Sequence, residues 1–513
     1  DDTRYALNKR AVEEKYMGPL IKTVMTRCIQ CTRCVRFVTE VAGVPEIGLT
    51  GRGEDVEITT YLEQAVTSEL SGNVIDLCPV GALTSKPWAY NYRPWELKKT
   101  ESIDVMDAMG ANIRVDARGA EVMRVLPRVH DDVNEEWISD KTRFACDGLM
   151  RQRLDRPFVR RDGRLREASW AEALAVVADR LRAASPERIG VIAGDLQDAE
   201  SVKAVLDLFR ALGVANLDCR QDGAKIGAGP RGGWLFNTTF AGLEQADALL
   251  LVGTNPRLEA PVLNARIRKR WLNGPLQVGV IGEAAELTYR YEHVGGGPRS
   301  LRSLADGQFR FGEVLAGAER PALVLGMGAL ARPDGAAVLR LAAQAADRFG
   351  LVKDGWNGFN VLHTAAGRVG ALDLGFVPGE GGLDVAGMLR PGALDVLFLL
   401  GADECDVKAA EGAFVVYLGT HGDAGAHRAD VILPGAAYTE KSGIYVSSEG
   451  RVQIANRAVF PKGDAREDWA ILRALSDRVG ARLPYDSLAD LRRRLFAEHP
   501  TFGRVDYVAP GAP

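Results

Sequence analysis

The sequence has few cysteines and few histidines, seven and six among 513 residues. Scaffolds held together by disulfides are short secreted chains with a much higher share of cysteine, so this composition disfavours one. The scarcity also limits metal chemistry, because a site built only from thiolates uses four cysteines. Seven cysteines therefore allow one all-cysteine site and no second.

A strong charge imbalance and a long apolar run are also lacking. The net charge is −4 and the isoelectric point is near 6.0, which gives no sign of a nucleic-acid-binding surface. The longest apolar stretches, such as 246–252, are too short to cross a membrane and are typical of buried strands. We therefore expect membrane association only through partner proteins.

A signal peptide is not recognisable at the start of the sequence, and the first residue is Asp1 rather than Met. We therefore expect that the beginning of the natural chain is absent from this sequence.

Four of the cysteines form the most informative pattern. Two residues separate Cys28 from Cys31 and Cys31 from Cys34, and Cys78 follows after 43 more residues and precedes Pro79. Three thiolates packed this closely can each bind a different iron of one 4Fe–4S cluster, and a distant fourth thiolate completes the set. A proline after the last ligand is also part of the bacterial ferredoxin pattern. The spacing therefore predicts a cluster that carries electrons.

A zinc site is the main alternative for these four residues. Structural zinc sites usually have two separate Cys-x2-Cys pairs, each gripping one side of a tetrahedron. Here the two pairs share Cys31, which suits a cube better. Zinc, a disulfide and free thiols stay open as minor alternatives.

The remaining cysteines and histidines show no comparable pattern. Cys146 and Cys219 lie 73 residues apart, and Cys405 follows 186 residues later. No histidine is spaced to complete a ligand set with them. Their simplest interpretation is as ordinary buried or surface side chains.

Basic side chains surround the three closely spaced cysteines: Lys22, Arg27, Arg33 and Arg36. Positive charge near a cluster favours its reduced, more negative state and raises its reduction potential. The solvated face of a helix explains the same residues about as well.

The first part of the chain has short elements of several kinds. Residues 4–16 have helical composition, and residues 25–40 are expected to form a loop and then a helix around the cysteines. Residues 101–127 alternate apolar and polar side chains between glycines, which predicts a small β-meander.

From about residue 168 onward, short apolar strands alternate with helices. The expected strands end at glycine turns and cover 188–192, 246–252, 276–281, 322–325, 395–400 and 414–418. Helices are expected over 170–182, 258–271 and 335–348. This alternation predicts an α/β fold with doubly wound parallel sheets.

Glycine turns at the carboxyl ends of parallel strands are where α/β sheets bind nucleotides and phosphates. None of these turns has the Gly-x-Gly-x-x-Gly pattern that opens a helix, and no Walker sequence is present. A plain turn is the simpler interpretation of each.

Longer motifs extend along nearly the whole chain: Lys9-Arg-Ala-Val, Lys22-Thr-Val-Met-Thr-Arg-Cys28, Asp76-Leu-Cys78-Pro-Val-Gly-Ala-Leu83, Lys141-Thr-Arg-Phe144, Asn360-Val-Leu-His363 and Ala429-Asp-Val-Ile-Leu-Pro434. Together they closely resemble the large iron–sulfur subunit of proton-pumping NADH:quinone oxidoreductase, respiratory complex I. The second half of the chain also resembles the molybdopterin oxidoreductases.

The resemblance implies a specific division of the chain. Residues 1–100 would form a small ferredoxin-like iron–sulfur domain, and residues 101–160 a small β-rich subdomain that is a degenerate cluster domain. Residues 161–513 would form a molybdopterin oxidoreductase-like α/β region that holds no molybdopterin.

The resemblance also implies a role. Cys28, Cys31, Cys34 and Cys78 would hold one 4Fe–4S cluster that relays electrons, one at a time, from NADH and flavin on a neighbouring subunit toward quinone. No catalytic residue is expected on this chain. Its partners would be other subunits of the peripheral arm, including the subunit that binds flavin and NADH. The complex would lie on the cytoplasmic side of a bacterial inner membrane or on the matrix side in mitochondria.

The chain departs from the family pattern in two places. The family begins with segments that hold a 2Fe–2S cluster and another 4Fe–4S cluster, and we expect these only in a missing amino-terminal segment. Some members also hold an extra cluster at the start of the molybdopterin-like region. The matching stretch, 105–112, has no cysteine, and Cys146 alone cannot hold a cluster. We expect that extra site to be absent.

Two other functions compete with the electron relay. An active molybdenum or tungsten oxidoreductase, such as a formate dehydrogenase subunit, needs a protein ligand to its metal. Cys219 falls a few residues early for that role, and Asp222 is a candidate without other support. The other competing function is a redox-inactive scaffold in which the α/β region serves as a docking surface.

Overall fold

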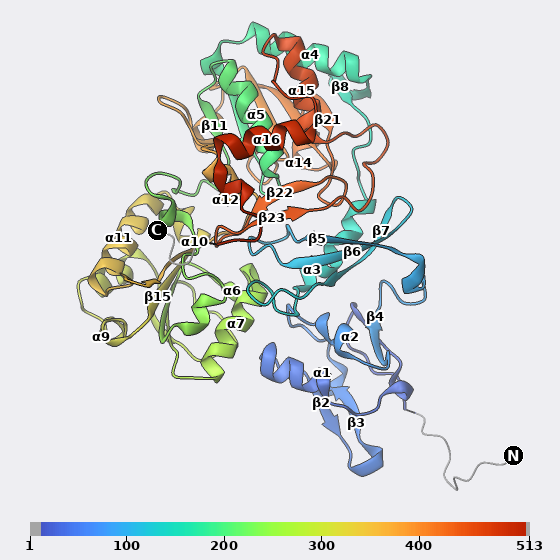
Figure 1. The fold of residues 1–513 in the computed structure, drawn as a ribbon, viewed down its shortest axis with the longest axis vertical. Coiled ribbons are helices and arrows are strands. Elements are labelled where there is room, and N and C mark those ends of the chain that lie inside the picture. Colours follow the sequence, from blue (N-terminus) through green and yellow to red (C-terminus); the bar gives the residue numbers. More distant parts are fainter. Residues whose placement is uncertain (1–11, 509–513) are drawn as a thin grey trace, which may run out of the picture.

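The computed structural model describes residues 12–508. Figure 1 shows the amino-terminal part at one end of the molecule, a three-stranded sheet in the middle, and the α/β region beyond and beside it. The expected α/β class with parallel sheets is confirmed. No helix in the described part of the chain is long and apolar enough to cross a membrane.

The amino-terminal part is built from two small antiparallel sheets and two short helices. One sheet pairs β1 with β4, and the other pairs β2 with β3. The elements are β1 (Ile21–Thr23), α1 (Arg33–Arg36), β2 (Ile47–Thr50), β3 (Glu57–Thr60), α2 (Asn73–Leu77) and β4 (Leu83–Ser85).

The loop followed by a helix that was expected over 25–40 is confirmed. A 3-10 turn over Met25–Arg27 leads into the loop, and α1 continues into a π-helical turn over Phe37–Val41.

The helix expected over 4–16 is wrong for the residues described. Residues 12–16 have no regular structure, and residues 4–11 lie outside the described part of the chain. The Lys15 N–H donates to the Thr23 hydroxyl at 3.2 Å, and the same hydroxyl donates to the Lys15 carbonyl at 2.8 Å. These bonds to β1 replace the hydrogen bonds of a helix.

The β-meander expected over 101–127 is confirmed, although its first strand begins earlier. It consists of β5 (Lys98–Ile103), β6 (Asn112–Arg118) and β7 (Glu121–Pro127), paired antiparallel in chain order. Ile113 and Val115 of the central strand are fully buried, because alternate side chains of a strand point to the same face. Helix α3 (Asp140–Phe144) follows the meander.

A seven-stranded sheet forms the first half of the α/β region, with the strand order β11-β10-β19-β20-β21-β8-β9. The strands are β8 (Phe158–Arg161), β9 (Arg164–Glu167), β10 (Ile189–Ala193), β11 (Asn216–Asp218), β19 (Val396–Leu400), β20 (Phe414–Gly419) and β21 (Val431–Pro434). The five strands from β11 to β21 are parallel. Since β8 pairs antiparallel with β21, the sheet already begins at Phe158.

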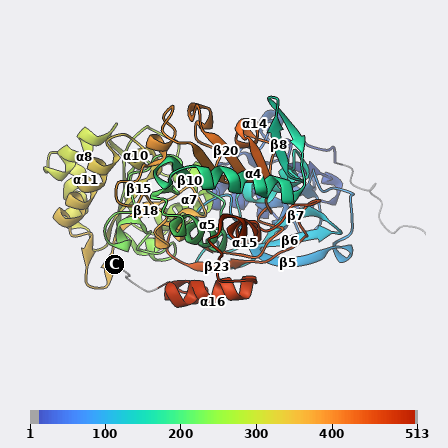
Figure 2. The same ribbon diagram turned by 90° about the horizontal axis from the view of Figure 1, so that it is seen from above.

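Seven helices accompany this sheet: α4 (Trp170–Ala183), α5 (Ala199–Ala211), α12 (Arg368–Asp373), α13 (Val385–Met388), α14 (Ala424–Arg428), α15 (Asp468–Val479) and α16 (Leu488–Glu498). Figure 2 shows α16 outermost, beyond α5 and α15. A hairpin of β22 (Gly443–Val446) and β23 (Val452–Ala455) lies between this sheet and the β-meander (Figure 1).

A parallel five-stranded sheet forms the other half, with the order β14-β13-β12-β15-β18. Its strands are β12 (Ala248–Val252), β13 (Gln277–Ile281), β14 (Glu292–Gly295), β15 (Pro321–Gly326) and β18 (Phe359–Leu362). Its helices are α6 (Pro256–Glu259), α7 (Pro261–Leu272), α8 (Pro298–Ala305), α9 (Arg310–Gly317), α10 (Met327–Leu330) and α11 (Gly335–Arg348). A short ribbon of β16 (Val352–Lys353) and β17 (Trp356–Asn357) completes it.

The single helix expected over 258–271 is two helices in the structure. Ala260 lies between α6 and α7 with φ −144° and ψ 74°. Pro261 explains the break, because a proline pushes the residue before it out of the helical region. The other two expected helices match α4 and α11 closely.

The amino-terminal part is tied to the α/β region through its π-helical turn. Arg268 of α7 donates to the carbonyls of Thr39 and Glu40 at 2.8 and 3.0 Å. The ring of Phe37 packs against Trp137 with 4.9 Å between centroids. These contacts fix the cysteine-bearing segment against the rest of the chain.

Candidate metal centre

The four predicted ligands come from separate segments that meet in the amino-terminal part. Cys28 follows the 3-10 turn, Cys31 lies in the loop and Cys34 is on α1. Cys78 directly follows α2. All four cysteines line one small cavity, although 43 residues separate Cys34 from Cys78 in the sequence.

The backbone of the ligand loop explains how three cysteines face the same space. Gln30 and Thr32, on either side of Cys31, have φ of 51° and 60°. Left-handed conformations are uncommon for residues other than glycine and reverse the chain sharply. The loop therefore wraps around the cavity instead of continuing as a helix.

Backbone amides donate to two of the sulfurs. The Gln30 N–H donates to Cys28 Sγ and the Leu83 N–H donates to Cys78 Sγ, each at 3.4 Å. Hydrogen bonds to the sulfurs stabilise thiolate charge and are one of the levers that set a cluster's reduction potential. Sequence reasoning did not find these amides, because their position depends on the folded loop.

The cavity is closed mostly by apolar side chains: Met25, Ile29, Ile58, Val80, Ala82 and Leu83. Cys34 is buried, Cys28 and Cys78 are half-buried, and Cys31 is exposed. Burial is the main cause that raises the pKa of Cys34 to about 11. Binding iron there therefore releases a proton from this thiol.

The donor set fits a 4Fe–4S cluster, because four thiolates around a common space can each bind one corner iron. Among the described residues, no group of three or more His, Cys, Asp or Glu side chains is arranged to hold a metal ion. A cluster makes a different demand, since each of its irons takes a single protein ligand.

The basic residues around the motif differ in their surroundings. Arg36 pairs with Glu40 at 3.4 Å on the surface. Arg27 and Arg33 are exposed, and among the described residues neither has a carboxylate within ion-pair distance. Arg33 also lines the cavity, so its positive charge lies close to the place where cluster charge would change.

The three other cysteines do not join this site. Cys146 is buried below the β-meander, and its thiol donates to the Arg143 carbonyl at 3.6 Å. Burial raises the pKa of both Cys146 and Cys219 to about 12, and that of Cys405 to about 11. All three are protonated thiols at neutral pH.

Cys219 and Asp222, the candidate ligands for the metal of a molybdopterin, lie in the α/β region. Arg368 is almost completely buried and forms ion pairs with Asp195 at 3.3 Å and Asp222 at 3.1 Å. Asp222, the candidate metal ligand, is therefore engaged by an arginine, and Cys219 is a protonated thiol. To bind a metal, Asp222 would have to give up its ion pair with Arg368. The sequence did not reveal the two partners of Arg368, because they lie far from it along the chain.

Three family models match the chain in order. The ferredoxin-like domain of NADH-quinone oxidoreductase subunit 3 matches residues 18–84, which include all four clustered cysteines. The 4Fe–4S domain of the NADH-ubiquinone oxidoreductase NDSU1/NuoG-like proteins matches residues 97–147. The molybdopterin oxidoreductase family matches residues 153–478.

Curated proteins match over almost the full chain. The chain is 51% identical to the mitochondrial 78 kDa subunit of NADH-ubiquinone oxidoreductase of Neurospora crassa, over 98% of this chain and 68% of that protein. The chain belongs to the large iron–sulfur subunit family of NADH:quinone oxidoreductase. The family also includes the mitochondrial iron–sulfur protein 1 of NADH dehydrogenase from Solanum tuberosum, 51% identical over 99% of this chain and 68% of that protein. The corresponding NADH-quinone oxidoreductase protein of Rickettsia bellii is 48% identical over 98% of this chain and 72% of that protein.

A solved structure supports the fold assignment for this member of the family. Acetylene hydratase from Pelobacter acetylenicus superposes with a TM-score of 0.58 at 14% identity, covering 80% of this chain and 72% of that chain. At this identity the likeness concerns the fold alone. The expected fold class, with ferredoxin-like and molybdopterin oxidoreductase-like parts, is confirmed.

Proposed function

We propose that the chain is an electron-relay subunit of NADH:quinone oxidoreductase in which Cys28, Cys31, Cys34 and Cys78 hold one 4Fe–4S cluster. The observation that carries the proposal is that these four cysteines line one cavity within the segment matched by the ferredoxin-like family model. A 4Fe–4S cluster, when bound, accepts and releases one electron at a time.

The protein's own residues prepare the site for that role. The amides of Gln30 and Leu83 donate to two sulfurs and so favour the additional negative charge of the reduced state. Apolar side chains such as Met25 and Ile58 exclude water from the cavity, and the positive charge of Arg33 favours reduction. Cys31 is exposed, so electrons have a short route to a neighbouring protein on this side.

We propose a single cluster for this chain. Residues 97–147 match a 4Fe–4S family model, but Cys146 is the only cysteine among them. The proposed domain boundaries are 1–100 for the cluster domain, 101–160 for the degenerate domain and 161–513 for a cofactor-free α/β region.

We propose the other peripheral-arm subunits as partners, including the subunit that binds flavin and NADH. The site would lie on the cytoplasmic side of a bacterial inner membrane or on the matrix side in mitochondria. Membrane association would run through partner subunits. Family membership supports this placement.

The test is anaerobic analysis of iron, sulfide, zinc and molybdenum in the purified chain, with EPR spectroscopy of the reduced form. We expect about four irons and four sulfides and a cubane signal, which Cys31→Ala abolishes. Cys146→Ala is the matched control and retains both iron and signal. Zinc without sulfide would overturn the relay, and stoichiometric molybdenum would favour an oxidoreductase instead.

A further inference from the structure

The connection between β4 and β5 gathers exposed aromatic side chains. Figure 1 shows this connection at the outer edge of the molecule, between β4 and the start of β5. Tyr90, Tyr92 and Trp95 in it are 81%, 37% and 79% exposed. Large apolar side chains that gather on a surface mark a place that another molecule covers, and Tyr and Trp are enriched at protein interfaces. We call residues 86–96 the aromatic loop.

The aromatic loop is held in shape although it is exposed. The side-chain amide of Asn91 donates to the Pro87 carbonyl at 2.9 Å, and the Glu96 carboxylate accepts from the Arg93 N–H at 2.7 Å. Tyr90 has φ 65°, a left-handed conformation that is uncommon for a bulky residue. A loop that is already ordered loses less conformational entropy when a partner binds.

Positive charges lie over the aromatic rings of the loop. The distances from the charged groups to the ring centroids are between 4.1 and 5.9 Å. Each of the four aromatic side chains has such a neighbour: Lys22 over Tyr90, Arg118 over Tyr92, Arg93 over Trp95 and Arg124 over Trp88. Cation–π contacts of this kind orient both groups, so the loop presents rings and positive charges together.

The loop and the start of β5 also carry an excess of positive charge. Residues 86–99 contain one acid, Glu96, and four basic residues: Lys86, Arg93, Lys98 and Lys99. All four basic side chains are exposed, and among the described residues none of them has a carboxylate within ion-pair distance. The chain as a whole, by contrast, has a net charge of −4. This surface therefore complements an acidic one.

A groove of about 280 Å³ adjoins the aromatic loop. Pro87 and Trp88 line it from the loop, and Phe144 at the end of α3 lines it from the other part of the chain. Interface anchors are side chains that fill pockets of this kind. Leu83 lines both the groove and the cysteine cavity, and its N–H donates to Cys78 Sγ. A partner seated in the groove therefore lies close to the proposed cluster.

We propose that the aromatic loop is the docking surface for a neighbouring subunit of NADH:quinone oxidoreductase that presents carboxylates around an apolar anchor side chain. The carboxylates pair with Lys86, Arg93 and Lys99, and the anchor fills the groove beside Trp88. The inference rests on the assembly with other subunits proposed above. It adds which face of this chain is used and what chemistry the partner presents.

A single-stranded nucleic acid is the competing occupant, because bases stack on exposed aromatic side chains in basic grooves. Two observations favour a protein. The net charge of −4 opposes the approach of a polyanion, and a nucleic acid needs a groove that follows several nucleotides. The groove beside the aromatic loop holds only about 280 Å³, which suits one anchor side chain.

Hydroxyl-radical labelling read by mass spectrometry tests the surface, on the isolated chain and on the purified complex that contains it. We expect the labelling of Tyr90 and Trp95 to be lost in the complex, because interface anchors are shielded from water. Phe460 is the matched control and keeps its labelling. It is 69% exposed and has Arg457 over its ring at 4.6 Å, but it lies outside the aromatic loop.

Cross-linking of the complex with a carbodiimide tests the chemistry of the partner, because this reagent joins a lysine amine directly to a carboxylate. We expect links from Lys86 and Lys99 to Asp or Glu side chains of one other subunit. The position of those links identifies the acidic surface that faces the aromatic loop.

Variants test whether the surface contributes to affinity. We expect Arg93→Glu and Trp95→Ala each to weaken incorporation at least about tenfold in competition with the wild-type chain during reconstitution of the complex. Arg310→Glu, at an exposed arginine on α9, and Phe460→Ala are the matched controls and should compete as the wild type does. An unchanged Tm shows that each variant is folded.

Three results would overturn the docking surface: equal labelling of the loop in the isolated chain and the complex, links only to carboxylates of this chain, or protection that nuclease treatment removes. Each of them concerns a chain that has assembled with its partners. A chain that joins no complex would instead refute the proposed assembly itself. None of these readouts depends on electron transfer, so the proposed cluster is tested separately.

Discussion

Arg153 and Glu440 form a two-pronged ion pair that is almost completely buried. The two pairs of nitrogen and oxygen atoms lie 2.6 and 2.7 Å apart, and the side chains are 6% and 1% exposed. Arg153 follows the β-rich part of the chain, whereas Glu440 lies just before β22. The pair therefore joins two parts of the chain that are 287 residues apart in the sequence.

Replacing Arg153 by leucine leaves the Glu440 carboxylate buried without its partner. We expect Arg153→Leu to lower the free energy of unfolding by about 3–5 kcal/mol, measured by denaturant unfolding. Arg182→Leu is the control, because its ion pair with Asp179 is exposed and contributes about 0–1 kcal/mol. Equal small losses in both variants would contradict a structural role for the buried pair.

The unpaired charge of Arg33 raises the reduction potential of the proposed cluster. We expect Arg33→Gln to lower that potential by about 10–40 mV, the equivalent of about 0.2–1 kcal/mol for a charge near the surface. Redox titration monitored by EPR measures the shift. Arg299→Gln on α8 removes another exposed charge, from a residue that does not line the cysteine cavity. The reduction potential of this variant should match that of the wild type. An unchanged potential in Arg33→Gln would argue against this electrostatic role.

Gly194 allows the ends of β10 and β19 to approach each other closely. A Cβ at Gly194 would lie 1.9 Å from the Gly401 carbonyl oxygen, so the backbone of two neighbouring strands would have to separate. We expect Gly194→Ala to destabilise the chain by about 1–3 kcal/mol or more, seen as a lower Tm. At Gly317 a Cβ meets no atom within 4 Å, and Gly317→Ala should leave the Tm unchanged or slightly raised. A similar Tm for both variants would refute the close approach.

Asp104 makes stability depend on pH. Burial, and then the charge of Asp107, raises the pKa of Asp104 to about 7, above its value of about 3.9 in an unfolded chain. The folded state therefore binds a proton that the unfolded state has already lost. Stability contributed by the protonated acid is present below about pH 4 and is lost as the pH rises through about 7.

Between pH 4 and pH 8 the free energy of unfolding should fall further in the wild type than in the Asp104→Asn variant. The difference between the two falls should be about 3–4 kcal/mol. The amide oxygen can still accept from the Thr142 hydroxyl, as Asp104 does at 2.9 Å. Unfolding free energies measured at several pH values give the two slopes. Asp162→Asn, at an 89% exposed side chain, should follow the wild type. Parallel curves for Asp104→Asn and the wild type would show that this carboxyl titrates normally.

The sequence by itself determined the class of the fold and the set of candidate ligands. Cys28, Cys31 and Cys34 lie within seven residues, so local spacing alone limits the chemistry that they can do together. The strands expected over 188–192, 322–325 and 395–400 correspond to β10, β15 and β19, and each strand end agrees with its expected position within one residue. Short apolar runs between glycines are a local signal, because each run must be buried whatever surrounds it.

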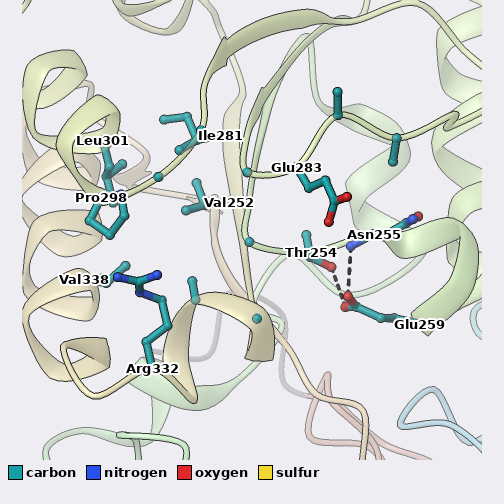
Figure 3. A pocket seen from close by; sticks show the side chains of 18 of the residues that line it. Val252, Thr254, Asn255, Glu259, Ile281, Glu283, Pro298, Leu301, Arg332 and Val338 are labelled. Carbon is teal, nitrogen blue, oxygen red and sulfur yellow. Dashed lines mark hydrogen bonds between the residues drawn. The ribbon is translucent and has the colours of Figure 1, made fainter.

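Only the tertiary structure decided how distant residues combine. Composition favoured a helix at residues 12–16, but in the structure Lys15 forms hydrogen bonds with Thr23 of β1. Asp222 forms an ion pair with the buried Arg368. The tertiary structure also places the glycine turns after β12, β13 and β15 around one cavity (Figure 3). Pairing of this kind depends on which strands become neighbours and on what each side chain meets after packing. A single sequence records the residues but not those neighbours.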